Sequence, residues 1–295
     1  MQRSELEILL AVVDHGSFSA AARMLGYTPS AVGKRVHLLE KRLRVPLLIR
    51  STRRMSLTEA GQRYVGEARD ILARMTALEE GIAEDDGRLR GVVRMTCSAA
   101  LGRRLVVPLV NDFMSLHPDL EIELLMTDKL VDLVGEGFDI AIRSGTLTDS
   151  TLISRKIAEN RRVICAAPKY TEVHGAPQNP KELADHRCLR LKQEKLVADW
   201  GMANGDSHHA RLGPGMTCNS LEALQSACLH GVGIAWLPEF LIERDLNEGN
   251  LIPVLSEFTD STAGGGVFVL RPETSFLPRR VRLLVEHLAA GFGRN

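Results

Sequence analysis

The sequence lacks the motifs by which the common classes of enzyme are recognised. It contains no GxSxG, no HExxH, and no GxGxxG or phosphate-binding loop that follows a strand. The triplet Gly264-Gly265-Gly266 precedes a predicted strand and does not lead into a helix, so we interpret it as a loop. The pair His208-His209 lacks the spacing of metal ligands. We therefore predict that the chain is not an enzyme and has no catalytic residue, no metal site and no cofactor.

Cysteine is sparse and shows no pairing pattern. The chain has five cysteines, an odd number, and none of them belongs to a CxxC motif. Their spacing excludes a disulfide framework and a zinc site, and it fits a reducing cytoplasm. The longest apolar runs are too short to cross a membrane, and the N-terminus does not have the pattern of a secretory signal. We therefore expect a cytoplasmic protein with no membrane partner.

Net charge is also absent, because 37 basic residues balance 37 acidic ones. The balance conceals an asymmetry along the chain. Residues 1–65 hold 11 Lys and Arg against 5 Asp and Glu, so this segment carries +6 and the remainder carries −6. A basic segment attached to an acidic body indicates a polyanionic partner for that segment alone.

The basic segment begins with three predicted helices. Ser4, Ser17 and Thr28 are their expected N-terminal caps, and Pro29 suits the first position of the third helix. The first two helices repeat apolar residues at helical spacing and end near Gly16 and at Gly26, and only three or four residues separate the second helix from the third. This spacing is typical of a helix-turn-helix.

The third predicted helix has two different faces. Val32, Val36, Leu39 and Leu43 form an apolar stripe. The opposite side offers hydrogen-bonding groups and positive charge, and it contains no acid: Ser30, Lys34, His37 and Lys41. A helix of this kind fits the major groove of DNA, although many charged helix faces are simply solvated.

A hairpin follows the third helix. Residues 45–49 and 55–57 are predicted to form two short strands, and the polar turn between them contains Arg50, Arg53 and Arg54. A hairpin with a basic tip after a helix-turn-helix is a wing, and arginine at its tip suits contact with phosphate or insertion into the minor groove.

Five short runs of this segment carry a resemblance to a known family. They lie at 16–22, 30–32, 39–43, 46–50 and 57–61. In this order they resemble the LysR-type transcriptional regulators of bacteria. The sequence departs from the family at Gly33, where Ser is usual, and at Arg44, where Gly is usual. Gly33 removes one potential contact with phosphate or base, whereas Arg44 adds charge near the turn and need not disturb the fold.

The resemblance and the helix faces together imply binding to double-stranded DNA through a winged helix-turn-helix at residues 1–58, the head. The predicted DNA-contacting residues are Ser17, Thr28, Pro29, Ser30, Gly33, Lys34, His37, Arg50, Arg53 and Arg54.

A long helix is predicted to follow, with Thr58 as its cap, at residues 59–88. Its apolar residues are spaced by four and three in alternation, which is the heptad pattern of a coiled coil. The family pairs two subunits through this helix, although the stripe could instead pack on the body of the same chain. The predicted dimerisation residues are Tyr64, Ala68, Ile71, Met75, Leu78 and Ile82.

Strands and helices alternate after a polar hinge, so residues 91–295 are predicted to form an α/β body, with helices at 101–117 and 130–135 among its elements. The resemblance extends through this body, and it implies an effector-binding domain with two lobes and the fold of a periplasmic binding protein. We expect lobe 1 at 91–160 and 267–295, lobe 2 at 161–266, and a ligand cleft between them. By resemblance, the effector-binding residues are Ser98, Ala99, Leu101, Thr127, Ser144 and Asn219.

Ser98 follows a predicted strand and precedes a helix, so its hydroxyl and the helix N–H groups could hold an anion, or the hydroxyl could simply cap the helix. Besides DNA, we expect a second copy of the chain as partner, in a homodimer or homotetramer, with RNA polymerase as a further candidate. The effector is a small molecule of unknown identity.

Two alternatives remain open. The body could be an enzyme or a solute-binding protein with an accessory DNA-binding head. The chain could also sense oxidants, because peroxide-sensing members of the family carry two cysteines in the stretch that corresponds to 195–210. That stretch contains none here, and Cys188 and Cys218 flank it. We interpret both as structural residues.

Overall fold

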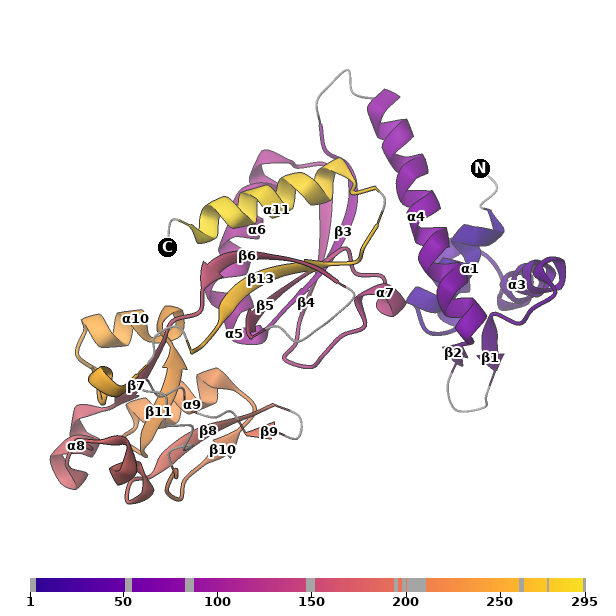
Figure 1. Ribbon diagram of the computed structural model, residues 1–295. Coiled ribbons are helices and arrows are strands. Elements are labelled where there is room, and N and C mark those ends of the chain that lie inside the picture. Colours follow the sequence, from indigo (N-terminus) through magenta and orange to yellow (C-terminus); the bar gives the residue numbers. More distant parts are fainter. Residues whose placement is uncertain are drawn as a thin grey trace.

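The computed structural model describes residues 4–50, 55–82, 88–146, 152–193, 196–197, 200, 211–259, 263–274 and 276–293. Arg53 and Arg54 at the predicted tip of the wing lie outside these residues, and so does the pair His208-His209. The chain forms a small helical head, a long helix beside it, and two α/β lobes (Figure 1). The fold is therefore the predicted one, an N-terminal winged helix-turn-helix followed by a two-lobed α/β domain.

Three helices form the head: α1 (Glu5–Asp14), α2 (Phe18–Leu25) and α3 (Pro29–Leu43). Each begins at the predicted cap. Ser4 and Glu7 form a reciprocal capping box, the Ser17 hydroxyl accepts from the Ala20 N–H at 3.1 Å, and the Thr28 hydroxyl accepts from the Ala31 N–H at 3.2 Å. These bonds satisfy backbone donors that a helix leaves open at its start.

The wing is an antiparallel pair of strands, β1 (Leu48–Arg50) and β2 (Met55–Leu57). The first strand begins three residues later than predicted. At this point a side chain of α3 accepts hydrogen bonds from the backbone N–H groups. The Glu40 carboxylate accepts from the Leu47 N–H at 2.9 Å and from the Leu48 N–H at 3.1 Å. Glu40 thereby ties the start of the wing to the helix that precedes it.

The long helix α4 (Glu59–Ile82) shares the core of the head. Thr58 caps it, because its hydroxyl accepts from the Gly61 N–H at 2.9 Å, and the same hydroxyl donates to the Pro46 carbonyl at 2.8 Å. A side chain at Gly61 would put a Cβ 2.1 Å from the Leu47 carbonyl oxygen, so only glycine fits at this position. The first turns of α4 are therefore anchored to the wing.

Lobe 1 has a five-stranded sheet of order β4-β3-β5-β13-β6. Strand β3 runs parallel to β4 and β5, whereas β13 runs antiparallel to β5 and β6. The strands are β3 (Gly91–Cys97), β4 (Leu120–Met126), β5 (Ile140–Gly145), β6 (Ile153–Glu159) and β13 (Gly266–Arg271). The helical segments are α5 (Ala99–Leu101), the π-helix η2 (Gly102–Val106), α6 (Val107–Leu116), α7 (Leu133–Glu136) and α11 (Arg279–Phe292). Helices α6 and α11 lie together over the sheet (Figure 1).

Two predicted helices of lobe 1 differ from the structure. The helix expected at 101–117 begins at Ala99 and widens into a π-helix before it continues as α6. The helix expected at 130–135 begins only at Leu133, because the Asp132 carboxylate accepts from the Gly135 N–H at 2.9 Å and so sets its start.

Lobe 2 has a six-stranded sheet in which β10-β8-β11-β7-β12 are neighbours and β9 pairs with β8. The strands are β7 (Arg162–Ala166), β8 (Cys188–Gln193), β9 (Leu196–Val197), β10 (Thr217–Cys218), β11 (Ile234–Pro238) and β12 (Ile252–Pro253). The helices are α8 (Pro168–His174), η3 (Pro180–Ala184), α9 (Leu221–Leu229), α10 (Glu239–Asn247) and η4 (Ser256–Phe258). One face of the sheet packs on α9 and α10, and the other face packs on α8 and η3.

The chain passes between the two sheets twice, and the crossings are bonded to each other. The backbone N–H of Asn160 donates to the Gly265 carbonyl at 3.0 Å, and its side-chain amide donates to the Gly264 carbonyl at 2.7 Å. Gly265 has a φ of +74°, and a Cβ there would lie 2.2 Å from the Gly145 carbonyl oxygen. The two crossings therefore form one compact joint between the lobes.

Candidate DNA-binding surface and effector site

The third helix presents the two faces that its sequence predicts. Val32, Val36 and Leu39 are fully buried in the head, and Leu43 is half-buried. Ser30, Lys34, His37 and Lys41 are exposed. The guanidinium of Arg35 lies 5.1 Å from the centre of the Tyr27 ring, so this neighbouring cation packs on the head. The exposed face of α3 thus remains basic and free of carboxylates.

The other predicted DNA-contacting residues lie around this face. Thr28 and Pro29 are exposed at the start of α3, whereas Gly33 is half-buried within it. Ser17 is half-buried, and its hydroxyl is engaged as the cap of α2. Arg50 is the last residue of β1.

The structure divides the predicted dimerisation seam of α4 into two parts. Ala68 is only 2% exposed and packs in the core of the head, with Tyr64 half-buried beside it. Ile71 and Met75 are about half exposed, at 50% and 51%. The side chains of Leu78 and Ile82 lie outside the description of the structure. In this chain, the head covers the first part of the seam, and Ile71 and Met75 are open to a partner.

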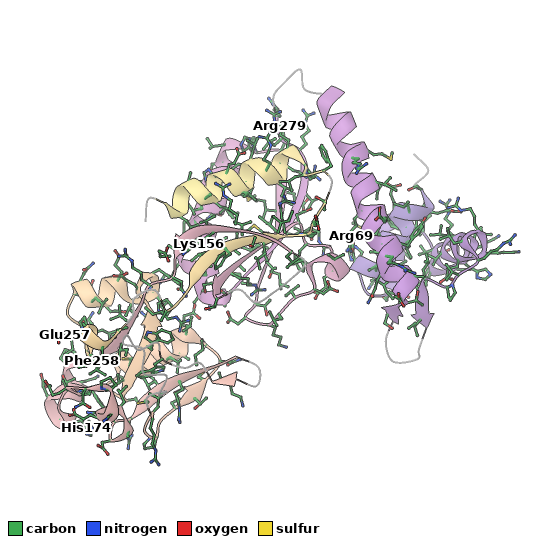
Figure 2. The ribbon with its side chains drawn as sticks, viewed as in Figure 1. Arg69, Lys156, His174, Glu257, Phe258 and Arg279 are labelled. Atoms are coloured by element: carbon green, nitrogen blue, oxygen red, sulfur yellow. The ribbon has the colours of Figure 1, made fainter. Side chains whose placement is uncertain are left out.

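Charged side chains join the head to lobe 1. Arg69 on α4 bonds to the Val134 carbonyl and to the Asp14 carboxylate of α1, and it faces the body (Figure 2). Arg94 on β3 lies 3.6 Å from the same Asp14 carboxylate and donates to Glu123 at 2.8 Å. Asp14 is therefore shared between an arginine of the long helix and an arginine of the body.

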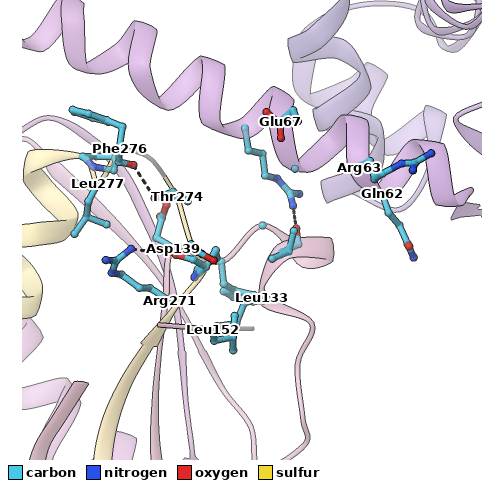
Figure 3. A pocket seen from close by; sticks show the side chains of 18 residues that line it. Gln62, Arg63, Glu67, Leu133, Asp139, Leu152, Arg271, Thr274, Phe276 and Leu277 are labelled. Atoms are coloured by element: carbon cyan, nitrogen blue, oxygen red, sulfur yellow. Dashed lines mark hydrogen bonds between the residues drawn. The ribbon is translucent and has the colours of Figure 1, made fainter. Parts of the chain in front are cut away.

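A cavity of about 670 Å³ lies beside these contacts, between α4 and lobe 1 (Figure 3). Gln62, Arg63 and Glu67 line it from α4, and Arg271 and Phe276 are among the residues that line it from the body. None of the six predicted effector-binding residues lines this cavity.

The predicted effector residues of lobe 1 gather where its parallel strands end. Ser98, Thr127 and Ser144 follow or end β3, β4 and β5, and all three are half-buried. Neighbouring parallel strands carry their carboxyl ends to one edge of a sheet, which explains this convergence. Ala99 is half-buried at the same edge.

The start of the helix at this edge is not an open anion site. The Ala99 N–H donates to the Asp128 carboxylate at 3.1 Å, and the Ser98 hydroxyl makes no capping bond. An internal carboxylate thus occupies the position expected for an anionic ligand. Of the two roles left open for the Ser98 hydroxyl, the capping bond does not form. Asp128 directly follows Thr127, so an acid just beyond a strand end was the signal that sequence analysis missed.

Arg143 on β5 is a second group at this edge that the predicted set does not include. Its guanidinium donates to the carbonyl of Thr127, to the hydroxyl of Thr96 at 3.2 Å and to the Lys129 carbonyl at 3.3 Å. Burial lowers the pKa of Arg143. The arginine holds together the loop that carries Thr127.

One predicted effector residue does not fit the structure. Leu101 is completely buried in the core of lobe 1, so its side chain is not available to a ligand. Leu101 lies two residues after the half-buried Ala99 in the same helical segment, so its side chain points to the opposite side, into the core. Asn219 is exposed in lobe 2, immediately before the N-cap of α9, where Ser220 accepts from the Ala223 N–H at 3.3 Å.

An ion pair joins the two lobes next to these residues. The guanidinium of Arg103, in η2 of lobe 1, donates twice to the Glu222 carboxylate in the first turn of α9, at 2.5 Å for each bond. Ala100 of lobe 1 packs in the same apolar cluster as Leu224 of α9. The starts of the helices at Ala99 and Leu221 therefore lie close together although they belong to different lobes.

The cysteines do not have the properties of an oxidant sensor. Cys97, Cys165, Cys188 and Cys228 are buried, and only Cys218 is partly exposed. Burial raises the pKa of Cys97 to about 11 and raises the pKa of Cys188, which keeps both thiols protonated. A protonated, buried thiol reacts slowly with oxidants.

Comparison with known proteins identifies the family. Residues 4–62 match the family described as bacterial regulatory helix-turn-helix protein, lysR family, and residues 86–293 match the LysR substrate binding domain. The chain is 35% identical to the HTH-type transcriptional regulator CrgA of Neisseria meningitidis over 99% of this chain and 97% of that protein. It is 33% identical to the HTH-type transcriptional activator TtdR of Escherichia coli, over 97% and 92% of the two chains.

The solved structures agree with this assignment. The structure of CrgA superposes with a TM-score of 0.64 at 33% identity, and the match covers 99% of this chain and 100% of that one. Among the helices that the structure describes, none has the length and apolarity needed to cross a membrane. The chain is a LysR-type transcriptional regulator, with a helix-turn-helix that binds DNA and an effector-binding domain.

Proposed function

We propose that this regulator reads base sequence with α3, pairs with a second copy through α4, and responds to a small molecule held between lobes 1 and 2. The exposed face of α3 is the observation that carries the proposal, because it combines hydrogen-bonding groups and positive charge without any carboxylate. The N-terminal half of such a helix meets base edges in the major groove. Arginines of the wing suit the phosphate backbone.

Two substitutions on the same face of α3 test the reading of bases. Lys34 lies in the N-terminal half of α3 and Lys41 near its end, and both are exposed. We expect Lys34→Ala to weaken binding to the operator by about 1–3 kcal/mol and to relax the sequence preference. Lys41→Ala removes the same charge and serves as the control. We expect it to lower the affinity for operator and scrambled duplexes by the same amount. Equal behaviour of both variants on operator and scrambled DNA in a shift assay would refute the assignment.

The pairing of two copies through α4 is supported by the exposed apolar side chains of Ile71 and Met75. Ile71→Glu would place two carboxylates in an apolar interface, where burial of an unpaired charge is strongly unfavourable. We expect a lower molar mass by light scattering and loss of operator binding. Val173→Glu, on the exposed surface of α8, is the control. If Ile71→Glu has the same molar mass as the unsubstituted chain, the proposal is contradicted. We further propose that two such dimers join through their bodies to form a homotetramer.

The response to an effector is supported by the approach of the helix starts at Ala99 and Leu221 from different lobes. A ligand shifts a conformational equilibrium only by its different affinity for two states, and a ligand between lobes contacts both of them only when they are closed. Opening or closing would break or form the Arg103–Glu222 pair. Movement of the lobes would then change the packing of the bodies and the spacing of the two heads on DNA.

Thermal-shift screening of the chain against small organic acids and aromatic metabolites would find the effector. We expect Ser98→Ala to weaken its binding by about 1 kcal/mol, the contribution of an ordinary hydrogen bond. Ser115→Ala is the matched control, because the Ser115 hydroxyl donates to the Asn111 carbonyl within α6. If both variants bind the effector as the parent does, the site lies elsewhere.

Contact with RNA polymerase is a further proposal, and co-elution of the DNA-bound regulator with the polymerase would test it.

A further inference from the structure

Among its described residues, lobe 2 contains three buried N–H donors that have no hydrogen-bond partner. They are Nε of Arg162 on β7, Nε of Arg190 on β8 and Nε1 of Trp236 on β11. A buried donor without a partner loses the hydrogen bond that it makes with water, so native proteins rarely leave one open. Three such donors in one lobe require an explanation.

The three side chains lie on the same face of the sheet, and Arg162 is two residues before Ile164, the partner of Trp236 on β7. Their strands are neighbours, in the order β8-β11-β7, and adjacent strands are about 4.8 Å apart. Leu189 and Leu191 face the side of α9, so Arg190 between them faces the other side, where Trp236 packs. The guanidinium of Arg162 lies over the Trp236 ring, 4.6 Å from its centre.

The described part of the chain provides no counter-charge for the two guanidinium groups. Across the residues that the structure describes, no carboxylate lies within ion-pairing distance of Arg162 or Arg190, and neither side chain donates a hydrogen bond. Arg143 shows the ordinary arrangement, since its partly buried guanidinium donates to three oxygen atoms. Desolvation alone lowers the pKa of Arg162 to about 10, which agrees with the absence of a nearby anion.

Solvent reaches part of each arginine. Arg162 and Arg190 are each partly exposed as residues, although their Nε atoms are buried. A small ligand could therefore reach the guanidinium groups without unfolding the lobe. The ligand must accept several hydrogen bonds and carry negative charge, which are the properties of an oxyanion.

We propose that Arg162, Arg190 and Trp236 form a binding site on lobe 2 for a small oxyanion, a carboxylate or a phosphate. The site includes none of the six residues predicted to contact the effector, and it goes beyond the proposed function. It lies beside the joint between the lobes, because a Cβ on Gly264 would be 3.0 Å from Cγ of Arg162, and Asn160 bonds to the same glycine. An anion bound here would stiffen the segment through which the lobes are connected.

The chain has two tryptophans, Trp200 and Trp236, so the substitution Trp200→Phe leaves Trp236 as the only indole. We would titrate this full-length variant with succinate, with inorganic phosphate, and with chloride at equal ionic strength, and follow tryptophan emission. The expected result is a saturable change with succinate or phosphate and none with chloride. The anion that saturates at the lower concentration identifies the source of the oxyanion. Calorimetry on the unsubstituted chain should give the same affinity.

Substitution of the arginines then tests the site directly. Arg162→Gln and Arg190→Gln should each weaken binding at least tenfold, which is the loss expected for a charge-assisted hydrogen bond. Arg162→Lys keeps the charge and the fold but removes the buried Nε, and it should also weaken binding. Arg155→Gln, at an exposed position of β6, removes the same charge and should bind as the parent does. The proposal is overturned if no anion gives saturation, or if the variants at Arg162 and Arg190 bind like Arg155→Gln.

Discussion

Removal of the Glu40 carboxylate should detach the wing from α3. One oxygen of this side chain accepts from the backbone N–H groups of both Leu47 and Leu48, at 2.9 and 3.1 Å. The side chains of Leu47 and Leu48 are 1% and 5% exposed, so these N–H groups lie in the core of the head. Glu40→Ala leaves both donors without the acceptor that orders the start of β1.

The expected cost follows from the two bonds. A buried donor that loses its partner costs about 1–3 kcal/mol, and partial access of water at the half-buried Glu40 brings the sum to about 3 kcal/mol for Glu40→Ala. Glu40→Gln retains an acceptor oxygen at the same place and loses only the charge, for which we expect about 1 kcal/mol. Lys41→Ala, the adjacent exposed residue, should change the free energy of unfolding by less than about 0.5 kcal/mol.

Thermal unfolding followed by circular dichroism would rank the three variants. Hydrogen exchange of a peptide that contains Leu47 and Leu48 would show whether their N–H groups lose protection, which is the local consequence of the same change. Operator binding should fall for Glu40→Ala because the wing loses its fixed position. If Glu40→Ala melts with Glu40→Gln, and both N–H groups stay protected, the carboxylate does not hold the wing.

Three further predictions concern single positions. A Cβ at Gly33 would meet no atom within 4 Å, so Gly33→Ala should stabilise α3 by about 1 kcal/mol, and a lower melting temperature would reveal a contact that the structure lacks. Arg44 has a φ of 56°, which glycine adopts without strain, so Arg44→Gly should add about 1 kcal/mol, and an unchanged or lower melting temperature would contradict this. Because the pKa of Cys97 is about 11, its thiolate amounts to about one part in a thousand at pH 8, so iodoacetamide should modify the partly exposed Cys218 first. Mass spectrometry that finds Cys97 modified first would show that the thiol is not shielded.

Local features of the head could be predicted from sequence because their causes are local. The caps at Ser4, Ser17 and Thr28 act on N–H groups two or three residues away, and each forms as expected. The apolar stripe of α3 is likewise a property of spacing within one helix. Arg44 takes the left-handed conformation that the usual glycine of the family would take, so the substitution leaves the path of the chain unchanged.

Features that depend on distant parts of the chain could not be predicted in the same way. The bonds between Arg103 and Glu222 join residues 119 positions apart, and neither residue has a local pattern that indicates its partner. Heptad spacing predicts that one face of α4 will be covered, but it does not distinguish a second copy of the chain from another part of the same chain. The structure shows that the head covers Ala68, whereas Ile71 stays exposed. The orphaned donors of lobe 2 come from three separate strands and have no motif.

The division of α4 has a consequence for how a signal could reach DNA. Val65 and Ala68 belong to the core of the head, and Thr58 bonds α4 to the wing, so the head and the first part of α4 move as one rigid unit. Asp14 bonds to Arg69 within that unit and lies 3.6 Å from Arg94 in the body. A movement of lobe 1 must therefore break the contact of Arg94 with Asp14 and the bond of Arg69 to the Val134 carbonyl, or else carry the whole head with it. Substitution of Arg94 by Gln would separate these two cases, because only a rigid coupling through this contact requires its charge.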